Sequence, residues 1–321
     1  MKNILIFRTD RIGDFLIISS MYSSIKRNFS DCNIDIVCSK LNYKYVKTYN
    51  FFNKVFLYPD NFYKKIKFFF SLNKYDYIFV TDGKKRSIYI SIFKKAKLKI
   101  LFTPSLSIKS LFGIFFDKIF FIDYNFPKIY LIESFLKEIN CNLIEDDSNF
   151  ISKYENSASL PTNNIEGDYI IFNFDEKWFF DQYIDSYVNI EPTNDQFINF
   201  VSELIKVYKV VIVNGYKSNK ILDNFKSTNP SKVIIKNNID IFEFQSLIKK
   251  CKHIVTCHGA PSHIASNYGI KIIDIIDKSE VKFFESYSHH FKNKTQLFRE
   301  DFTKLSQKIL NSLNISINKT H

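Results

Sequence analysis

Short runs of apolar residues, many of them β-branched or aromatic, alternate along the chain with longer segments in which apolar residues recur at helical spacing. Apolar runs of this length that are bounded by polar turns are typical of buried strands. Strands that alternate with helices form a parallel sheet with helices on both faces. In the first half of the chain the predicted strands are 4–7, 34–38, 77–80 and 98–102.

A second series of strands follows a polar interval rich in Ser and Asn, 152–168, which we interpret as a linker. A helix is predicted at 195–208, because its apolar residues fall on one face. We therefore predict an α/β protein of two Rossmann-like domains that face each other across a cleft. The domains are predicted at 1–155 and 167–321, and the last helix could pack back on the first domain. The predicted strands of the second series are 169–173, 210–213, 233–235, 254–256 and 272–276.

Composition limits the class of protein only broadly. The 321 residues suit two domains, and 45% hydrophobic with 24% charged residues is typical of a globular protein. The 35 phenylalanines and 7 glycines indicate a coding bias toward Phe, Lys, Ile and Asn. The formal net charge of +12 is therefore weak evidence about binding partners. The lysines are scattered, and no zinc pattern or RNA-binding motif occurs, so no nucleic-acid partner is expected.

The five cysteines are scattered without a Cys-x-x-Cys pair, which favours reduced thiols in the cytoplasm. No signal-peptide core follows Met1, and no stretch qualifies as a membrane helix. Two segments, 64–70 and 109–122, place lysines beside dense aromatic residues. That mixture suits peripheral contact with the inner face of the cytoplasmic membrane. Burial in a Phe-rich core is the alternative, and we favour it.

The turn after the first strand carries the first candidate chemistry. Asp14 follows that strand, at the edge of the sheet where open α/β proteins bind ligands. A carboxylate there can accept a proton from a hydroxyl group, and Gly13 would permit a sharp turn into the next helix. Asp10 competes for this role, and a helix-capping Asp14 is the structural alternative.

A lysine and a loop carry the candidate chemistry of the second half. Lys177 follows the first strand of the second domain, where an ammonium group could stabilise phosphate charge without a metal. In the loop, Gly259 and Ala260 are small enough for phosphate oxygens to approach the backbone. A predicted helix beginning at Ser262 would offer its N–H groups to an anion, and His263 could add a hydrogen bond.

Three blocks of sequence together resemble the family 9 glycosyltransferases, the heptosyltransferase-like enzymes that build lipopolysaccharide cores. Block 8–14, Arg-Thr-Asp-Arg-Ile-Gly-Asp, is similar to the N-terminal signature of that family. Block 174–178, Phe-Asp-Glu-Lys-Trp, is similar to the segment with the donor-phosphate lysine. Block 255–266, Val-Thr-Cys-His-Gly-Ala-Pro-Ser-His-Ile-Ala-Ser, is similar to its donor loop, Asp-Thr-Gly-x-x-His-x-x-Ala. The blocks span nearly the whole chain.

The resemblance implies a GT-B fold and an inverting, metal-independent glycosyltransferase. It implies that Asp14 is the general base, and that Arg8, Arg11 and Gly13 lie on the acceptor side. The donor-phosphate residues it implies are Lys177, His258, Gly259, Ala260, Ser262 and His263. The donor is a nucleotide-diphosphate sugar, heptose or another hexose-like sugar, bound as a substrate, and no cofactor is expected. The acceptor is a lipid-linked or oligosaccharide part of lipopolysaccharide or a related cell-surface glycan. No Asp-x-Asp metal motif occurs.

The donor loop departs from the family pattern. His258 stands in place of Asp, Gly259 in place of Thr and Ala260 in place of Gly. A donor other than ADP-heptose therefore remains open, and so does a catalytically degenerate GT-B protein that only binds sugar nucleotides. A nucleotide-sugar epimerase is a further alternative, although its clustered carboxylates are not evident. An NAD-type oxidoreductase is disfavoured, because no Gly-x-Gly-x-x-Gly follows the first strand.

Overall fold

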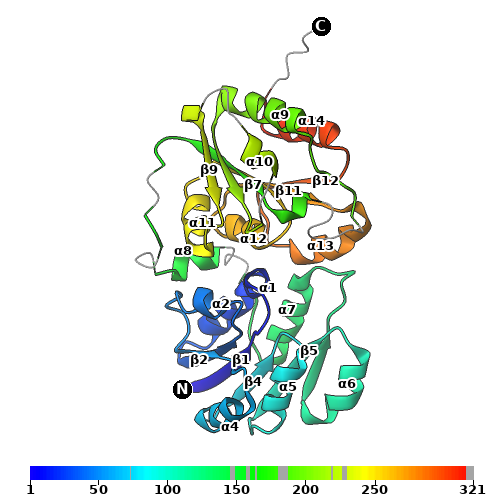
Figure 1. The fold of residues 1–321 in the computed structure, drawn as a ribbon. Coiled ribbons are helices and arrows are strands. Elements are labelled where there is room, and N and C mark those ends of the chain that lie inside the picture. Colours follow the sequence, from blue (N-terminus) through cyan, green and yellow to red (C-terminus); the bar gives the residue numbers. More distant parts are fainter. Residues whose placement is uncertain are drawn as a thin grey trace. The chain divides into compact units, whose positions relative to one another are not determined.

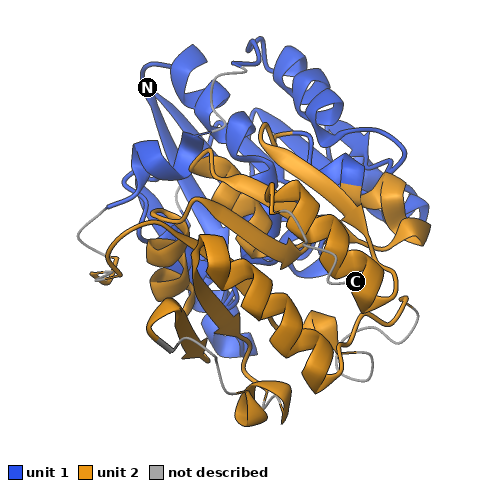
Figure 2. Ribbon diagram, turned by 90° about the horizontal axis from the view of Figure 1, so that it is seen from above, with its two compact units in different colours: residues 1–157, 285–289 blue, residues 158–284, 290–321 orange. Residues whose placement is uncertain are grey.

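The computed structural model describes residues 1–72, 74–144, 149–156, 160–162, 165–179, 187–217, 220–225 and 230–315. The chain forms two compact units, which are coloured separately in Figure 2. Unit 1 consists of residues 1–157 and 285–289, and unit 2 of residues 158–284 and 290–321. Each unit contains one six-stranded sheet whose strand pairs are all parallel (Figure 1).

The sheet of unit 1 has the strand order β3-β2-β1-β4-β5-β6. The order reverses between β1 and β4, the two central strands, because the crossover after β3 returns to the other side of β1. The central strands are fully buried over most of their length, whereas β3 and β6 lie at the edges and are only partly buried. The strands are β1 Lys2–Phe7, β2 Cys32–Cys38, β3 Lys54–Leu57, β4 Tyr77–Val80, β5 Leu98–Thr103 and β6 Lys118–Phe121.

Helices cover both faces of this sheet. One core cluster joins Phe68, Ile88 and Phe112 to the sheet, which places α4, α5 and α6 on the same face. On the other face Phe135 of α7 packs edge-on against Phe79 of β4, with ring centroids 4.9 Å apart. The helices are α1 Ile12–Ile17, α2 Ser19–Asn28, α3 Tyr43–Val46, α4 Phe62–Ser71, α5 Lys85–Ile92, α6 Leu106–Phe112, η1 Gly113–Phe115, α7 Lys128–Glu138 and α8 Phe150–Tyr154.

The sheet of unit 2 repeats the topology, with the order β12-β11-β10-β7-β8-β9. Its chain order reverses between β7 and β10, which are therefore the counterparts of β1 and β4. The strands are β7 Tyr169–Phe174, β8 Lys209–Asn214, β9 Val233–Asn237, β10 His253–Cys257, β11 Lys271–Ile276 and β12 Lys294–Phe298.

The core of unit 2 lies mainly between its sheet and two helices, Asn194–Val207 and Phe302–Ser312. Trp178 is fully buried there against Phe172 and Phe174, so it is a packing residue. The helices are η4 Glu176–Trp178, α9 Asn194–Val207, α10 Lys220–Asn224, η6 Pro230–Lys232, α11 Ile241–Ile248, α12 Ala260–Asn267, η7 Lys278–Glu280, α13 Val281–Tyr287 and α14 Phe302–Ser312.

Each predicted strand coincides with a strand of the structure, and the helix predicted at 195–208 is α9. Two details differ. The structure adds the edge strands β3, β6 and β12, and the predicted linker begins inside α8, where buried Phe150 and Ile151 anchor a short helix. The last helix, α14, packs in the core of unit 2 through Leu305 and Ile309. Among the described residues, no helix is long and apolar enough to cross a membrane.

Candidate functional site

The central strands of unit 2 bring the predicted lysine and the predicted donor loop together. Lys177 follows β7, and His258 and Gly259 follow β10, at the edge where open α/β sheets bind their ligands. Lys177 Nζ donates a hydrogen bond to the His258 carbonyl oxygen at 3.2 Å, and it lies 3.6 Å from Asp175 Oδ2. Two motifs that are far apart in the sequence thus form one site.

Lys177 is held in place from several sides. Its backbone N–H donates to the Asp175 carboxylate at 3.1 Å, and its carbonyl accepts a hydrogen bond from the buried guanidinium of Arg299 at 2.9 Å. A Cβ atom at Gly259 would lie 2.5 Å from Lys177 Nζ. A larger residue at this position would therefore displace the ammonium group from the loop. Its φ of 169° is extended backbone that any residue adopts.

His258 forms a carboxylate–imidazole pair. Its Nδ1 lies 2.7 Å from Oδ2 of Asp274, a residue that is 1% exposed in the middle of β11. Ser262 Oγ donates to the other oxygen of the same carboxylate at 2.8 Å. A carboxylate that accepts the Nδ1 proton fixes the ring and leaves Nε2 as the nitrogen that can meet a ligand.

Ser262 was expected among the donor-phosphate residues. In the structure it is fully buried, its Oγ donates to Asp274 and its N–H donates to the Gly259 carbonyl at 3.0 Å. Because a hydroxyl has one proton to donate, Ser262 positions Asp274 instead.

His263 is buried on the first turns of α12. Its ring stacks on that of His290, with centroids 5.1 Å apart, and its Nδ1 lies 3.1 Å from His290 Nε2. The ring also packs edge-on against His258 at 5.2 Å. His263 thus supports the loop and the His258 ring by packing.

The N-terminus of α12 offers fewer amides than the sequence predicted. Pro261 has no N–H, and the N–H groups of Ser262 and His263 both donate to the Gly259 carbonyl, at 3.0 and 3.3 Å. The N–H groups left for an anion are those of Gly259 and Ala260.

In unit 1 the block after β1 is organised by a buried arginine. Arg8 donates through Nη1 to the Thr81 carbonyl at 2.6 Å and through Nε to the Asp14 carbonyl at 3.1 Å. Its Nε also lies 3.2 Å from Asp10 Oδ1. Arg8 was predicted on the acceptor side, yet its guanidinium is consumed in shaping the turn, and only 6% of the residue is exposed.

Asp14 is the third residue of α1. Its Oδ2 accepts the backbone N–H of Arg11 at 3.2 Å, and the residue is partly exposed. This is a helix-capping contact, which a carboxylate can make while keeping a second oxygen for a ligand. Arg11 itself is exposed. Gly13 lies inside α1 and does not have a positive φ, so the chain turns before the helix and the expected role of Gly13 in a sharp turn is wrong.

Asp10 has a carboxyl group whose pKa is perturbed. Burial raises its pKa to about 7, against the opposing effect of Arg8, and the charges of Asp14 and Asp82 raise it further. Behind it, Asp82 accepts hydrogen bonds from the Thr9 N–H at 2.8 Å and the Thr9 hydroxyl at 2.6 Å. The ends of β1 and β4 thus carry three carboxylates around one arginine.

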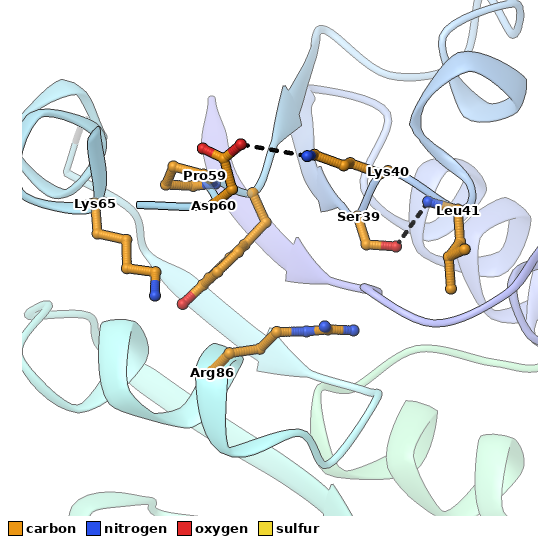
Figure 3. A pocket seen from close by; sticks show the side chains of 8 residues that line it. Ser39, Lys40, Leu41, Pro59, Asp60, Lys65 and Arg86 are labelled. Carbon is orange, nitrogen blue, oxygen red and sulfur yellow. Dashed lines mark hydrogen bonds and ion pairs between the residues drawn. The ribbon is translucent and has the colours of Figure 1, made fainter. Parts of the chain in front are cut away.

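A cavity of about 390 Å³ opens at the same edge of the unit 1 sheet (Figure 3). Lys65 and Arg86 extend into it from α4 and α5, whereas Lys40 turns to Asp60, with Nζ 3.2 Å from Oδ2. Arg86 Nε also donates to the Thr9 hydroxyl at 2.8 Å, which connects the cavity to the Arg8–Asp14 turn. The cavity is lined by Ser39, Lys40, Leu41, Tyr58, Pro59, Asp60, Lys65 and Arg86.

Three residues near these strand ends were not predicted from the sequence: Asp274, Arg299 and Lys128. A lone aspartate inside an apolar strand was the available signal for Asp274, because an isolated buried charge needs a partner. Arg299 follows an edge strand that was not predicted. Lys128 begins α7, is 5% exposed and lies over the ring of Tyr124, 4.5 Å from its centroid. Burial lowers its pKa to about 8, Arg8 lowers it further and Asp14 opposes this shift.

No protein-family model and no curated protein matches the chain. Solved structures do match over nearly its full length. A glycosyl transferase family 9 protein from Veillonella parvula DSM 2008 is 12% identical, with a TM-score of 0.66 over 99% of this chain and 90% of its own. E. coli heptosyltransferase WaaC with ADP is 13% identical, with a TM-score of 0.69 over 97% of this chain and 99% of its own. A UDP-GlcNAc 2-epimerase from Methanocaldococcus jannaschii is 13% identical, with a TM-score of 0.56 over 99% and 93%.

The two sheets and these matches define the fold as GT-B, built from two Rossmann-like domains. The fold predicted from the three sequence blocks is confirmed, and family 9 glycosyltransferases are among the proteins that share it.

Proposed function

We propose that the protein is an inverting, metal-independent glycosyltransferase. It would move a heptose or another hexose-like sugar from a nucleotide-diphosphate donor to lipopolysaccharide or a related cell-surface glycan. The observation that carries the proposal is the convergence of Lys177 with the His258–Gly259 loop beyond the central strands of unit 2. Structures of family 9 glycosyltransferases with the same two-sheet fold support it.

On the donor side, the site would stabilise the leaving nucleoside diphosphate. Lys177 Nζ, the Nε2 atom of His258 and the amides of Gly259 and Ala260 are the groups available to the phosphate oxygens. Such donors are most valuable where charge develops as the bond to the leaving group breaks. An ammonium group held beside the loop supplies the positive charge that other transferases take from a divalent cation.

On the acceptor side, Asp14 would accept the proton of the attacking hydroxyl group. The hydroxyl oxygen then forms its bond to the anomeric carbon while the bond from that carbon to the phosphate oxygen breaks. The bonding electrons leave with the nucleoside diphosphate, and a single displacement inverts the anomeric centre. Asp10 is the competing base, because its raised pKa makes it a stronger proton acceptor than an ordinary carboxylate once it is ionised.

The cavity of unit 1 would bind an anionic group of the acceptor, a phosphate or a carboxylate. Lys65 and Arg86 carry the charge that such a group needs, and Arg86 connects the cavity to the turn that carries Asp14. Lys65→Gln should raise the KM for an anionic acceptor with little change in kcat. Lys44→Gln, at an exposed lysine of α3 that does not line the cavity, is the matched control.

A calorimetric panel of nucleoside diphosphates and their sugars tests the donor side. Nucleoside diphosphates and nucleotide sugars of one base should bind the wild type. Lys177→Met should weaken that binding at least tenfold, about 1.4 kcal/mol. Absence of binding by every member would overturn the proposal. Incubating the binding sugar nucleotide with acceptor glycans then separates the alternatives. A rearranged sugar nucleotide without transfer identifies an epimerase, which the Methanocaldococcus match favours. Binding without any reaction identifies a degenerate binding protein.

A lipid-linked acceptor would require peripheral contact with the inner face of the cytoplasmic membrane.

A further inference from the structure

Three helices of unit 1 form one continuous outer surface. Because α4, α5 and α6 share a core cluster on the same face of the sheet, their outer sides point the same way (Figure 1). Lys94, after α5, donates to the Leu72 carbonyl at 3.0 Å and lies over the Phe69 ring, 4.2 Å from its centroid. Tyr89 of α5 packs edge-on against Phe112 of α6, with ring centroids 5.6 Å apart. We call the outer side of these helices and of η1 the α4–α6 surface.

Large apolar side chains project from this surface into solvent. Exposed apolar side chains do not contribute to the stability of the core. A group of such residues on one face indicates an interaction site. Among them are Phe62 (77%), Phe70 (77%), Phe93 (73%), Leu106 (69%), Leu111 (66%) and Ile114 (87%).

The charge of the same surface is predominantly positive. Helices α4, α5 and α6 contain no Asp or Glu, and residues 61–116 contain eleven lysines and one arginine but only two aspartates. Neither aspartate offsets the lysines of the helices. Asp76 is paired with Lys97 at 2.8 Å, and Asp82 is buried in its hydrogen bonds to Thr9. Exposed lysines stand between the apolar residues, among them Lys67, Lys85 and Lys109, whereas Lys64 is paired with Asp60 at 3.5 Å.

We propose that the α4–α6 surface docks on an anionic lipid bilayer. The phenylalanine, leucine and isoleucine side chains would enter the boundary between headgroups and acyl chains, and the lysines would meet lipid phosphates. The inference names a partner for the proposed function. It rests on that function in one respect, that the acceptor is lipid-linked.

The charge pattern favours a bilayer over a second copy of the chain. In a symmetric dimer the same patch meets itself, so lysines would face lysines. Like charges at such an interface are unfavourable, whereas an anionic leaflet complements every one of them. The partner must therefore be both apolar and anionic.

Flotation of the purified protein with vesicles tests the proposal. One set contains phosphatidylglycerol in phosphatidylcholine and the other phosphatidylcholine alone. We expect binding to the anionic vesicles only, and binding that weakens in high salt. Phe70→Ser with Ile114→Ser should lower the partition coefficient on the order of tenfold. Lys67→Gln with Lys109→Gln should lower it about fivefold per lysine.

Tyr130→Ser is the matched control. Tyr130 is 57% exposed on α7, which covers the opposite face of the sheet, and its loss should leave binding unchanged. Unfolding temperatures of all variants should stay close to wild type, because each side chain is exposed. Equal binding to uncharged vesicles, or a wild-type partition coefficient in the Phe70 and Ile114 variant, would overturn the proposal. So would concentration-dependent self-association that Phe70→Ser abolishes.

Failure of this inference and failure of the proposed function give different results. Vesicle binding by a protein that binds no nucleotide would keep the docking surface and remove the glycosyltransferase. Nucleotide binding and transfer without vesicle binding would keep the glycosyltransferase and remove the docking surface. The surface variants should bind the nucleoside diphosphate as wild type does, since none of their side chains belongs to unit 2.

Discussion

His258 Nδ1 lies 2.7 Å from Asp274 Oδ2, which joins the end of one central strand of unit 2 to the middle of its neighbour. In the family that the sequence resembles, the donor loop itself carries an aspartate at the position of His258. Here the carboxylate lies on β11, behind the imidazole. The change in the loop has therefore not removed an acidic group from the site. It has placed a ring nitrogen, rather than a carboxylate oxygen, on the side available to a ligand.

The pair makes a specific prediction for His258→Asp. That substitution restores the residue type of the family but puts a second carboxylate beside Asp274. Like charges at close range repel, and the nearby Lys177 ammonium is already paired with Asp175. We expect a lower unfolding temperature and weaker binding of the nucleoside diphosphate, measured by calorimetry. Adding Asp274→Asn should recover much of the lost stability, because it removes the repulsion.

His263→Ala is the comparison for that experiment. It removes a stacked, hydrogen-bonded ring, so we expect a loss of about 1–3 kcal/mol in stability with a smaller effect on binding. Wild-type affinity in His258→Asp would show that His258 does not face the diphosphate, and the loop histidine would then be structural.

Gly259→Ala tests the close approach of Lys177. A methyl group there would lie 2.5 Å from Lys177 Nζ, so the ammonium must move. We expect Gly259→Ala to weaken diphosphate binding almost as much as Lys177→Met. The double variant should be no worse than Lys177→Met alone, because both changes remove the same interaction. Additive losses in calorimetry would mean that the methyl group obstructs the ligand itself.

The sequence could predict the central parts of both sheets because their strands are buried on both faces. Such strands are continuous apolar runs, as in β7 and β10, and the pattern identifies them without further information. The edge strands β3, β6 and β12 begin with lysine and are only partly buried. Their mixture of polar and apolar residues is also found in loops. The sequence of such a segment therefore does not identify it as a strand, and its pairing with a neighbouring strand does.

The site was predictable to a similar degree. Lys177 and the donor loop could be placed at strand ends, and topology brings strand ends together. The direction of a side chain depends on partners elsewhere in the chain, which sequence spacing does not reveal. Ser262 and Arg8 are examples. Their side chains donate hydrogen bonds to the buried residues Asp274 and Thr81, which lie outside the recognised motifs.

Asp14→Asn should abolish transfer while leaving donor binding within a few-fold of wild type. The amide keeps the size and the capping position of the side chain but cannot take a proton. General-base catalysis contributes roughly 10²–10⁴ in rate, so kcat should fall by that factor. Calorimetry with the nucleoside diphosphate provides the control. Near-normal turnover in this variant would remove Asp14 from the mechanism and make Asp10 the base.

Chelation by EDTA should leave the transfer rate unchanged, because Lys177 and the loop supply positive charge to the leaving group. The measurement is initial rate with the identified donor after dialysis against EDTA, with and without added Mg²⁺ or Mn²⁺. A rate that falls on chelation and returns with either metal would contradict metal independence.

Asp10 gives a prediction in stability rather than in rate. Burial raises the pKa of this carboxyl group from 3.8 to about 7, so between these limits the folded chain holds a proton that the unfolded chain has released. A raised pKa contributes stability that is complete below pH 4 and is lost as the pH rises towards 7. The slope for one such group is at most about 1.4 kcal/mol per pH unit. Asp10→Asn removes this titration, so its unfolding free energy relative to wild type should rise between pH 5 and 7 and level off above. Urea unfolding of both proteins across that range measures the difference, and a difference that does not change with pH would show that Asp10 is ionised throughout.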